Sequence, residues 1–348
     1  MIPKADGSKR PLGISTIRDR VAQMAVKLVI EPIFEADFCD SSYGFRPKKS
    51  APDAVHDIGY GLNCGYTDVI DADVSQYFDS IPHAKLLAVV AERIVDGGIL
   101  HIIRMWLKAP VVGEDEDGTR RNIGGGKANT QGTPQGGVIS PLLANRYLHL
   151  LDRLWKPQDL QRRLEARLVR YADDQVILID GYRKWDWLAR AAYKRLLEEL
   201  TKLDVRINIE KTRIVDLTRD ESFSFIGFDL CRRKTWQGKW GVRITPRIKA
   251  RSALLSKLKE VFRRFVSQPV GRVIELINPI LRGWVNYFRV GHSSRCFSYV
   301  RDWVEKKIRR YLMRARNRKG FGWNRWSRGW MYQSLGLYSD YQVRYFRS

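Results

Sequence analysis

Two adjacent carboxylates, Asp173 and Asp174, stand in the stretch "RYADDQVILI", residues 170–179. The runs on either side are rich in β-branched and aromatic residues, which predicts a hairpin with the two aspartates at its connection. Tight hairpin turns favour Asn-Gly or Asp-Gly because their central residues need positive φ, and two aspartates supply neither. Such a local conflict is typical of a functional site. The alternative is a solvated acidic turn.

A second carboxylate-bearing strand is predicted at "YTDVIDADV", residues 66–74, where alternation places Asp71 and Asp73 on one face. If this strand ends beside the hairpin, Asp73 meets Asp173 and Asp174. Three close carboxylates repel one another unless a dication holds them, and their oxygens suit a hard octahedral ion such as Mg²⁺. Two such ions can clamp the attacking and leaving oxygens of a phosphoryl transfer. The residues therefore predict a metal site that acts on a nucleoside triphosphate.

The elements that must position these carboxylates follow from hydrophobic periodicity and from Gly and Pro. Helices are expected at 17–38, 82–95, 140–155 with Ser140 as N-cap, and 185–203. A Gly-rich loop with a weak hairpin around "EDEDG" is expected between Val111 and Gly137. The order strand, helix, helix, hairpin, helix, strand predicts an α+β fold, an antiparallel sheet backed by helices. Further helices are expected near 248–266, 270–290 and 297–316.

The net charge of the 348-residue chain is +24, which points to a polyanionic partner. Nucleic acid is the commonest large polyanion, and an anionic membrane surface is the rival. No apolar run is long enough to predict a membrane-spanning helix, and no signal peptide is visible. The four cysteines form no CxxC pair, so neither a zinc site nor a disulfide framework is expected, and a reducing cytoplasm is the expected location.

The positive charge is concentrated in the C-terminal part of the chain. Residues 246–348 carry 24 lysines and arginines against five acidic residues, which predicts a boundary near residue 245. The stretch 310–330 interleaves arginines with three tryptophans. Arginines neutralise phosphates and aromatic rings stack on bases, so Arg314, Arg316 and Arg318 are candidate RNA-binding residues. The alternative is a solvated basic face over a small aromatic core, and we expect most of the tryptophans to pack internally.

Eight motifs in order, the "YADD" signature and seven others, resemble those of group II intron reverse transcriptases over nearly the whole chain. "YADD" after an apolar strand is similar to the reverse transcriptase signature. The other motifs are "PKADGSKRPLGI" (3–14), "SSYGFRPKKSAPDAV" (41–55), "DADVSQYFDSI" (71–81), "QGTPQGGVISPLLANRYLHLLD" (131–152), "INIEKTRIV" (207–215), "FSFIGFDL" (223–230) and "NPILRGWVNYFR" (278–289). Chance does not account for such a series.

The resemblance implies a right-hand polymerase fold. Fingers and palm would occupy 1–228, a primer-grip hairpin 229–245, and a basic helical thumb or maturase domain X 246–348. The implied activity is that of an RNA-directed DNA polymerase, a nucleotidyltransferase that uses two Mg²⁺ ions and dNTPs. It would copy intron RNA into DNA from a DNA primer or target, and would assist splicing of that RNA as a maturase.

The resemblance also assigns roles to individual residues. The metal ligands would be Asp73, Val74, Asp173 and Asp174, with the three aspartates catalytic. Substrate contacts would come from Lys4 and Arg10 at the triphosphate, from Gln135 and Gly136 at the nucleotide pocket, and from Lys211 as an electrostatic helper. Phe78 would be the steric gate against a 2′-hydroxyl, or else a plain core aromatic. Asp79 is expected to stabilise its turn through hydrogen bonds, and Tyr171 to pack near the primer.

Two departures from the family pattern refine the expectation. The fingers motif starts at Pro3, so the resemblance implies a member that is short at its N-terminus. Nothing matches the cysteine pairs and histidines of the family's optional endonuclease domain, as in the compact bacterial class C-like members. The alternatives are a catalytically idle RNA-binding splicing factor, and a related bacterial reverse transcriptase that serves phage defence or sequence diversification.

Overall fold

The computed structural model describes the backbone of residues 2–3, 9–10, 13–114, 117, 119–155, 166–182 and 186–344. The chain forms two compact units. The first contains residues 1–54 and 64–216, and the second contains residues 55–63 and 217–348. Helix α2 (Ala51–Asn63) contributes its first residues to the first unit and the remainder to the second. No helix in the described ranges is long and apolar enough to cross a bilayer.

A four-stranded antiparallel sheet lies at the centre of the first unit. Its strand order is β6 (Ala166–Tyr171), β7 (Asp174–Ile179), β3 (Asp68–Asp73) and β8 (Arg213–Asp216). Both faces of β7 are covered, because every residue from Gln175 to Ile179 is buried. The first predicted strand, β3, pairs with strand β7 of the hairpin in an antiparallel ladder, which confirms the expected pairing.

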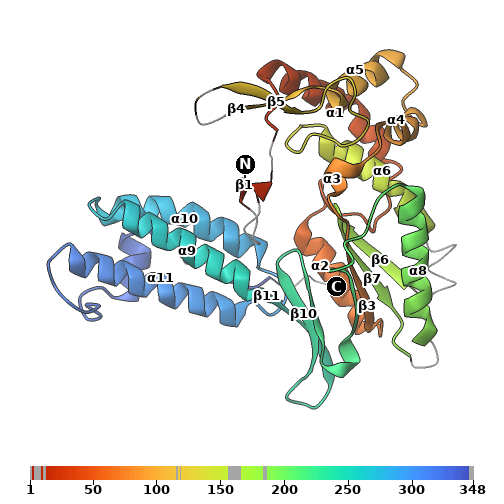
Figure 1. The fold of residues 1–348 in the computed structure, drawn as a ribbon. Helices are drawn as coiled ribbons and strands as arrows, with labels where there is room; N and C mark the ends of the chain where they lie inside the picture. The colour runs from red at the N-terminus through yellow and green to blue at the C-terminus, as the bar shows by residue number, and fades with distance from the viewer. Residues whose placement is uncertain are drawn as a thin grey trace. The chain divides into compact units, whose positions relative to one another are not determined.

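Two helices cover one face of this sheet. Helix α6 (Ser140–Leu154) and helix α8 (Asp186–Lys202) share a hydrophobic core with Ile70, Ile177 and Ile179. Figure 1 shows α8 running alongside the strands. Ser140 is the first helical residue of α6, and Ile139 is the N-cap residue, so the expected capping by Ser140 is wrong. Ile139 has helical dihedrals and makes no side-chain capping hydrogen bond, and the helix begins at Ser140, one residue earlier than an N-cap at Ser140 predicts.

The remaining elements of the first unit are mostly helical. They are β1 (Ile2–Pro3), β2 (Lys9–Arg10), α1 (Ile17–Glu35), α3 (Tyr77–Ser80), α4 (His83–Ala91), α5 (Gly97–Leu107), β4 (Val111–Glu114) and β5 (Arg120–Gly124). The β4–β5 hairpin lies where a weak hairpin was expected. At the start of α1 the Thr16 side chain accepts a hydrogen bond from the Asp19 amide, a typical N-cap.

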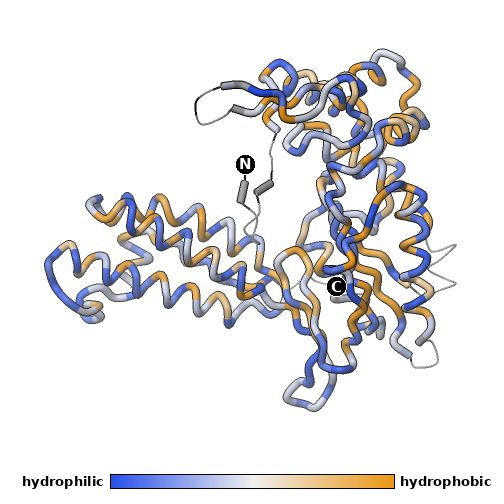
Figure 2. Tube along the Cα trace, in the orientation of Figure 1, coloured by the Kyte–Doolittle hydropathy of each residue, from blue (hydrophilic) through white to orange (hydrophobic). Residues whose placement is uncertain are grey.

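The second unit consists of a small sheet and a helical bundle. The sheet is β9 (Ser222–Phe225), β10 (Phe228–Lys234) and β11 (Trp240–Pro246), preceded by η2 (Leu217–Arg219). The bundle is α9 (Ile248–Arg264), α10 (Val270–Tyr287) and α11 (Ser294–Arg314), and a short π-helical turn, η3 (Trp330–Ser334), follows. Figure 2 shows apolar and hydrophilic residues alternating along the three long helices, as their periodicity predicts.

The division between the units falls at Asp216/Leu217, earlier than the limits expected at 228 and 245. The reason is that the small sheet packs with the helices that follow it. The ring of Phe228 in β10 stacks on Tyr287 and lies 4.9 Å from Phe288 between ring centroids. The Tyr287 hydroxyl also donates a hydrogen bond to the carbonyl of Ile226. The rise in positive charge after residue 245 coincides with the start of the helical bundle. The packing of Phe228 on α10 nevertheless joins the small sheet to that bundle in one unit.

Candidate active site

The carboxylates of the first unit gather at one end of the central sheet. Asp73, the last residue of β3, is the direct cross-strand partner of Asp174, the first residue of β7. Asp173 immediately precedes Asp174 in the connection of the β6–β7 hairpin. Like charges that face each other across two strands are destabilising, so fold stability does not explain this arrangement. The structure brings together the three aspartates that the sequence singled out.

The connecting turn consists of Ala172 and Asp173, not of the two aspartates as the sequence suggested. Asp174 already belongs to β7, where it pairs with Tyr171. Ala172 has φ +57°, a left-handed conformation that costs a non-glycine residue ~1–2 kcal/mol. The positive φ that a tight hairpin needs is therefore supplied by an alanine. Surrounding contacts must hold the chain in this conformation.

Those contacts come mainly from the buried guanidinium of Arg170. Its Nε and Nη2 donate to the two carboxylate oxygens of Asp152 at 2.7 and 2.6 Å, and both side chains are fully buried. Nη2 also donates to Ser42 Oγ at 2.7 Å. Nη1 donates to Asn145 Oδ1 at 3.0 Å and to the Ala172 carbonyl at 2.9 Å. All five N–H donors of the guanidinium are thus used, and one of them holds the turn itself.

The charge on Arg170 is maintained by its partner. Burial alone would lower the pKa of the guanidinium, but the charge and hydrogen bonds of Asp152 raise that pKa above its ordinary value. Asp152 lies near the end of α6, so this ion pair ties the hairpin to the helix that covers the sheet. Removing one partner of such a pair leaves an uncompensated buried charge.

The segment Ser41–Phe45 lies along β6 and completes this network. The Arg170 amide donates to the Ser41 carbonyl, and the Tyr43 amide donates to the Arg170 carbonyl, both at 2.8 Å. The side-chain amide of Asn145 donates to the Gly44 carbonyl at 2.6 Å. A Cβ at Gly44 would lie 2.4 Å from the backbone nitrogen of Ala172, so only glycine allows this approach. The "YGF" of the 41–55 motif therefore packs directly against the turn.

Positive charge reaches the carboxylates from the 207–215 motif. The Lys211 ammonium lies 3.0 Å from Asp73 Oδ2, as its expected place near the active site requires. The backbone amide of Asn208 donates to the Asp73 carbonyl at 2.7 Å, which fixes this segment beside β3. Arg213 lies 3.5 Å from the carboxylate of Asp71 on the same strand. Two cations thus offset part of the charge that the aspartates bring together.

The negative charge that these cations do not offset affects the pKa of Asp174. Desolvation by the surrounding protein, together with the neighbouring carboxylates of Asp173, Asp73 and Asp71, raises the pKa of the Asp174 carboxyl to about 7. The residue nevertheless lies at the solvent-exposed surface, so water screens part of this repulsion. The site is electrostatically unfavourable by itself and favours the binding of cations.

The donor chemistry at this site fits a hard divalent cation such as Mg²⁺. In the part of the chain that the structure describes, no three His, Cys, Asp or Glu side chains are already arranged as a metal site. The carboxylates would therefore turn toward a common point when an ion binds. The side chain of Val74 is apolar and buried, so only its backbone carbonyl could act as a ligand.

The short helix α3 positions the predicted nucleotide-side residues. Tyr77 is buried and its hydroxyl donates to the Ala144 carbonyl at 2.6 Å, which anchors the helix to α6. Phe78 is only partly buried, although it packs against the core. Its carbonyl accepts a hydrogen bond of 2.6 Å from the Thr133 amide in the Gly-rich loop. Tyr77 is thus the buried core aromatic of α3, whereas Phe78 remains partly exposed.

The Gly-rich loop lies against the end of α3. The side-chain amide of Gln135 donates to the Asp79 carboxylate at 3.0 and 3.2 Å, so Asp79 is hydrogen-bonded to the Gly-rich loop and not within its own turn as expected. Gly136 is exposed and has φ +106°, a conformation that favours glycine. Lys4 lies outside the described residues. Arg10 is described only through its backbone in β2, so the triphosphate contacts stay predictions.

The predicted RNA-binding arginines belong to the second unit. Arg314 ends α11, and Arg314, Arg316 and Arg318 are all exposed. The three tryptophans nearby divide much as expected: Trp326 is buried, Trp330 is half-buried and Trp323 is exposed. This surface is therefore accessible and carries cations, and the exposed ring of Trp323 has the Arg309 guanidinium 4.2 Å from its centroid.

Comparison with known proteins defines the class to which this fold and site belong. Residues 2–230 match the family described as "Reverse transcriptase (RNA-dependent DNA polymerase)", and residues 251–329 match "Group II intron, maturase-specific domain". The chain therefore belongs to the reverse transcriptase family and carries a group II intron maturase-specific domain. Members of this family use divalent metal ions and an RNA template.

Particular relatives support the same assignment. The chain is 34% identical over 283 residues to Protein YkfC of Escherichia coli, covering 72% of this chain and 71% of that protein. It is 26% identical over 380 residues to the group II intron-encoded protein LtrA of Lactococcus lactis, covering 86% of this chain and 61% of LtrA. It spans less than half, 44%, of an uncharacterized 91 kDa protein in a cob intron of Schizosaccharomyces pombe, at 27% identity and 86% coverage of this chain. The apo telomerase of Candida tropicalis matches 85% of this chain and 55% of its own at 12% identity and TM-score 0.49, too distant to add to the argument.

The Arg170 network is not predicted by any single motif of the sequence. Its signals were an arginine inside the apolar run "RLVRYA" and an aspartate at the end of the largely buried helix "LLANRYLHLLD". A charged residue in an apolar run is worth pairing with another such residue, because buried charges need partners. The sequence alone does not show that Ser42 and Asn145 complete the set.

The Arg170–Asp152 pair can be tested by separating stability from positioning. Arg170→Met should lower the free energy of unfolding by about 3–5 kcal/mol, because it leaves Asp152 charged and buried without its partner. The double variant Arg170→Met/Asp152→Leu should recover much of that loss in urea denaturation, since neither charge remains. Its primer extension should stay below about a tenth of wild type, because the Ala172 carbonyl still lacks its donor. Wild-type extension by the double variant would show that the network only stabilises the fold.

Asp174→Asn should change the pH dependence of stability. The folded-state pKa of about 7 lies above the ordinary value of 3.8, so the wild type loses stability as pH rises between these values. The variant has no such carboxyl, so its melting temperature should exceed that of the wild type by more at pH 8 than at pH 5. Thermal unfolding in EDTA measures both. A difference that is constant with pH would contradict the raised pKa.

Proposed function

We propose that the protein is an RNA-directed DNA polymerase that copies group II intron RNA into DNA, using dNTPs and extending a DNA primer or target. The observation that carries the proposal is the pairing of Asp73 with Asp174, with Asp173 in the adjoining turn. This arrangement lies in the part of the chain that matches the reverse transcriptase family. Carboxylates held this close together are suited to binding the divalent cations that accompany a polyphosphate substrate.

Asp73, Asp173 and Asp174, with the backbone carbonyl of Val74, would hold two Mg²⁺ ions. When bound, such ions neutralise charge on the attacking and leaving oxygens of nucleotidyl transfer. The chain's own residues hold these ligands in place through the Arg170 network. The ammonium of Lys211, 3.0 Å from Asp73, would add positive charge for the polyphosphate as the ions bind.

The remaining first-unit residues would bind and select the nucleotide. Phe78, partly exposed beside the buried Tyr77, would lie under the sugar and exclude a 2′-hydroxyl. Gln135 and Gly136 would shape the pocket, because the first is tied to α3 through Asp79 and the second lets the backbone approach the substrate. Lys4 and Arg10 would contact the triphosphate.

The second unit would supply RNA affinity and the maturase function. Its bundle matches the group II intron maturase-specific domain over 251–329, and residues 246–348 carry most of the net charge. Arg314, Arg316 and Arg318 would bind phosphates of the intron RNA. The maturase-specific match favours the intron type over a reverse transcriptase that serves phage defence or diversification.

Primer extension on poly(rA)/oligo(dT) tests the proposal directly. Asp174→Ala should lower the rate by more than about 10²-fold, because a lost metal ligand removes several kcal/mol of transition-state stabilisation. Asp71→Asn is the matched control, since Asp71 lies on the same face of β3 but pairs with Arg213. The control should extend the primer normally. Equal extension by Asp174→Ala and wild type would sink the assignment.

Phe78→Val should relax discrimination between rNTPs and dNTPs by about tenfold or more, the scale of small steric differences in a binding pocket. Tyr77 remains as the core anchor, so the melting temperature should change little and dNTP incorporation should persist. Single-nucleotide incorporation with paired rNTP and dNTP measures the ratio. If the ratio stays at the wild-type value while the melting temperature falls, Phe78 is a core residue only.

A further inference from the structure

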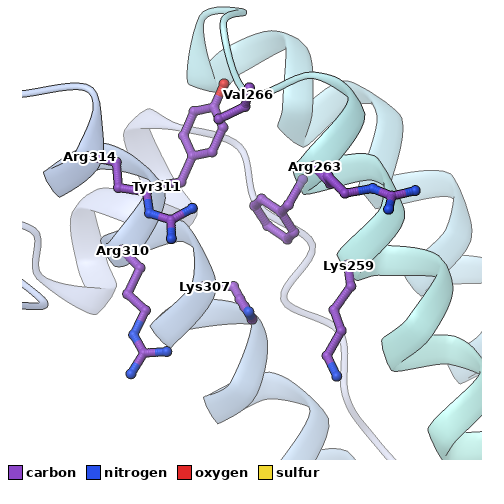
Figure 3. A pocket seen from close by; sticks show the side chains of 8 residues that line it. Lys259, Arg263, Val266, Lys307, Arg310, Tyr311 and Arg314 are labelled. Carbon is purple, nitrogen blue, oxygen red and sulfur yellow. The ribbon is translucent and has the colours of Figure 1, made fainter.

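Five lysines and arginines, and no acidic residue, are among the described residues that line a groove in the second unit. It lies between α9 and α11 and encloses about 300 Å³. Figure 3 shows Lys307 between the two helices, with Lys259 extending from α9 and Arg310 from α11. Arg314 also lines the groove, one turn further along α11. The volume is at the lower end for ligand pockets, about the size of a single small ligand rather than of a helix.

The charges in this groove reinforce one another. Burial lowers the pKa of the Lys307 ammonium, and the positive charges of Arg310, Lys259 and Arg314 lower it further. A different face of α11 is balanced: Arg309 lies 3.4 Å and Arg328 lies 2.9 Å from the carboxylate of Glu305. On the groove side the cations lie near aromatic rings instead of acids: the Lys307 ammonium is 5.3 Å from the ring centroid of Trp303, and the Arg310 guanidinium is 4.6 Å from that of Phe321. A group of cations that repel at close range favours an anionic ligand.

The floor of the groove is apolar and rigid. The rings of Phe262 and Tyr311 lie 6.0 Å apart between centroids. The Tyr311 hydroxyl is hydrogen-bonded to the carbonyls of Phe265 and Gln268, which fixes the orientation of the ring. Val266 is 55% exposed at the edge of this floor. The ligand must therefore present an apolar face as well as negative charge.

A nucleotide with an unstacked base meets both requirements, whereas a paired helix presents mainly phosphates and hydroxyls. We propose that this groove binds one unpaired nucleotide of RNA, with its base against Val266 and the aromatic floor and its phosphates among Lys259, Lys307 and Arg310. The proposal rests on the proposed RNA-binding function of the second unit and names the feature of the RNA that the unit reads.

Fluorescence anisotropy with two labelled RNA hairpins tests it on the full chain. The hairpins have the same stem of about 12 base pairs, and one carries a single bulged adenosine. Wild type should bind the bulged hairpin about tenfold more tightly, the scale of one base stacked on a protein surface. Val266→Asp should remove this preference, because it places a carboxylate where the base would lie. The groove variant Lys259→Gln/Lys307→Gln/Arg310→Gln should remove it as well.

The matched control is Lys257→Gln/Arg282→Gln/Arg295→Gln, which removes the same charge at three exposed positions that do not line the groove. It should weaken both complexes equally and keep their ratio. Equal binding of the two hairpins by wild type, or an equal loss of preference in the control, would overturn the groove proposal. In that case, salt-dependent binding of both hairpins would still support RNA binding by the second unit. If neither hairpin bound in a salt-dependent way, RNA binding by the second unit would be refuted as well. Displacement of the bulged hairpin by poly-glutamate as readily as by unlabelled bulged RNA would identify a general polyanion site and overturn the proposal.

Discussion

The buried ion pair between Arg170 and Asp152 is the contact on which the active-site end of the first unit depends. It joins the hairpin strand β6, the covering helix α6 and the segment that contains Ser42. Each of these comes from a different part of the chain, and none touches the proposed reaction directly. Through the Ala172 carbonyl the same guanidinium holds a left-handed alanine in place. The buried Arg170–Asp152 ion pair thus fixes the conformation of this turn and, with it, the position of Asp173.

Each of the two units holds a group of like charges, negative in the first unit and positive in the second. In the first, carboxylates are held close by the ladder between β3 and β7, and Lys211 offsets them only in part. In the second, cations from α9 and α11 share a groove. Each arrangement is unfavourable for the protein alone and becomes favourable with a ligand of opposite charge. Folding energy from the apolar cores keeps both sets of like charges together.

The sequence predicts best those residues whose role follows from their own type and their neighbours in the chain. Strand β3, the β6–β7 hairpin, the bundle helices and the carboxylates could be predicted, because alternation, periodicity and an aspartate inside an apolar run are local signals. Arg170 shows the limit, since its partners lie at Ser42, Asn145 and Asp152 and only the fold brings them together. The turn at Ala172 was misread for the same reason: its φ is set by contacts, not by residue preference. The change in charge near residue 245 does not reveal where the two compact units divide, because that division follows the packing of Phe228 on α10.

The strand order of the first unit has a consequence for how the protein is made. β3 lies between β7 and β8, and both neighbours follow it by about a hundred residues or more in the chain. During synthesis, the central strand therefore leaves the ribosome long before either partner exists, with Val69 and Ile70 not yet covered. Contacts between such distant segments form slowly, and exposed apolar strands are prone to aggregate meanwhile. The pairing that brings Asp73 beside Asp174 thus also leaves the central strand of the nascent chain uncovered for much of its synthesis.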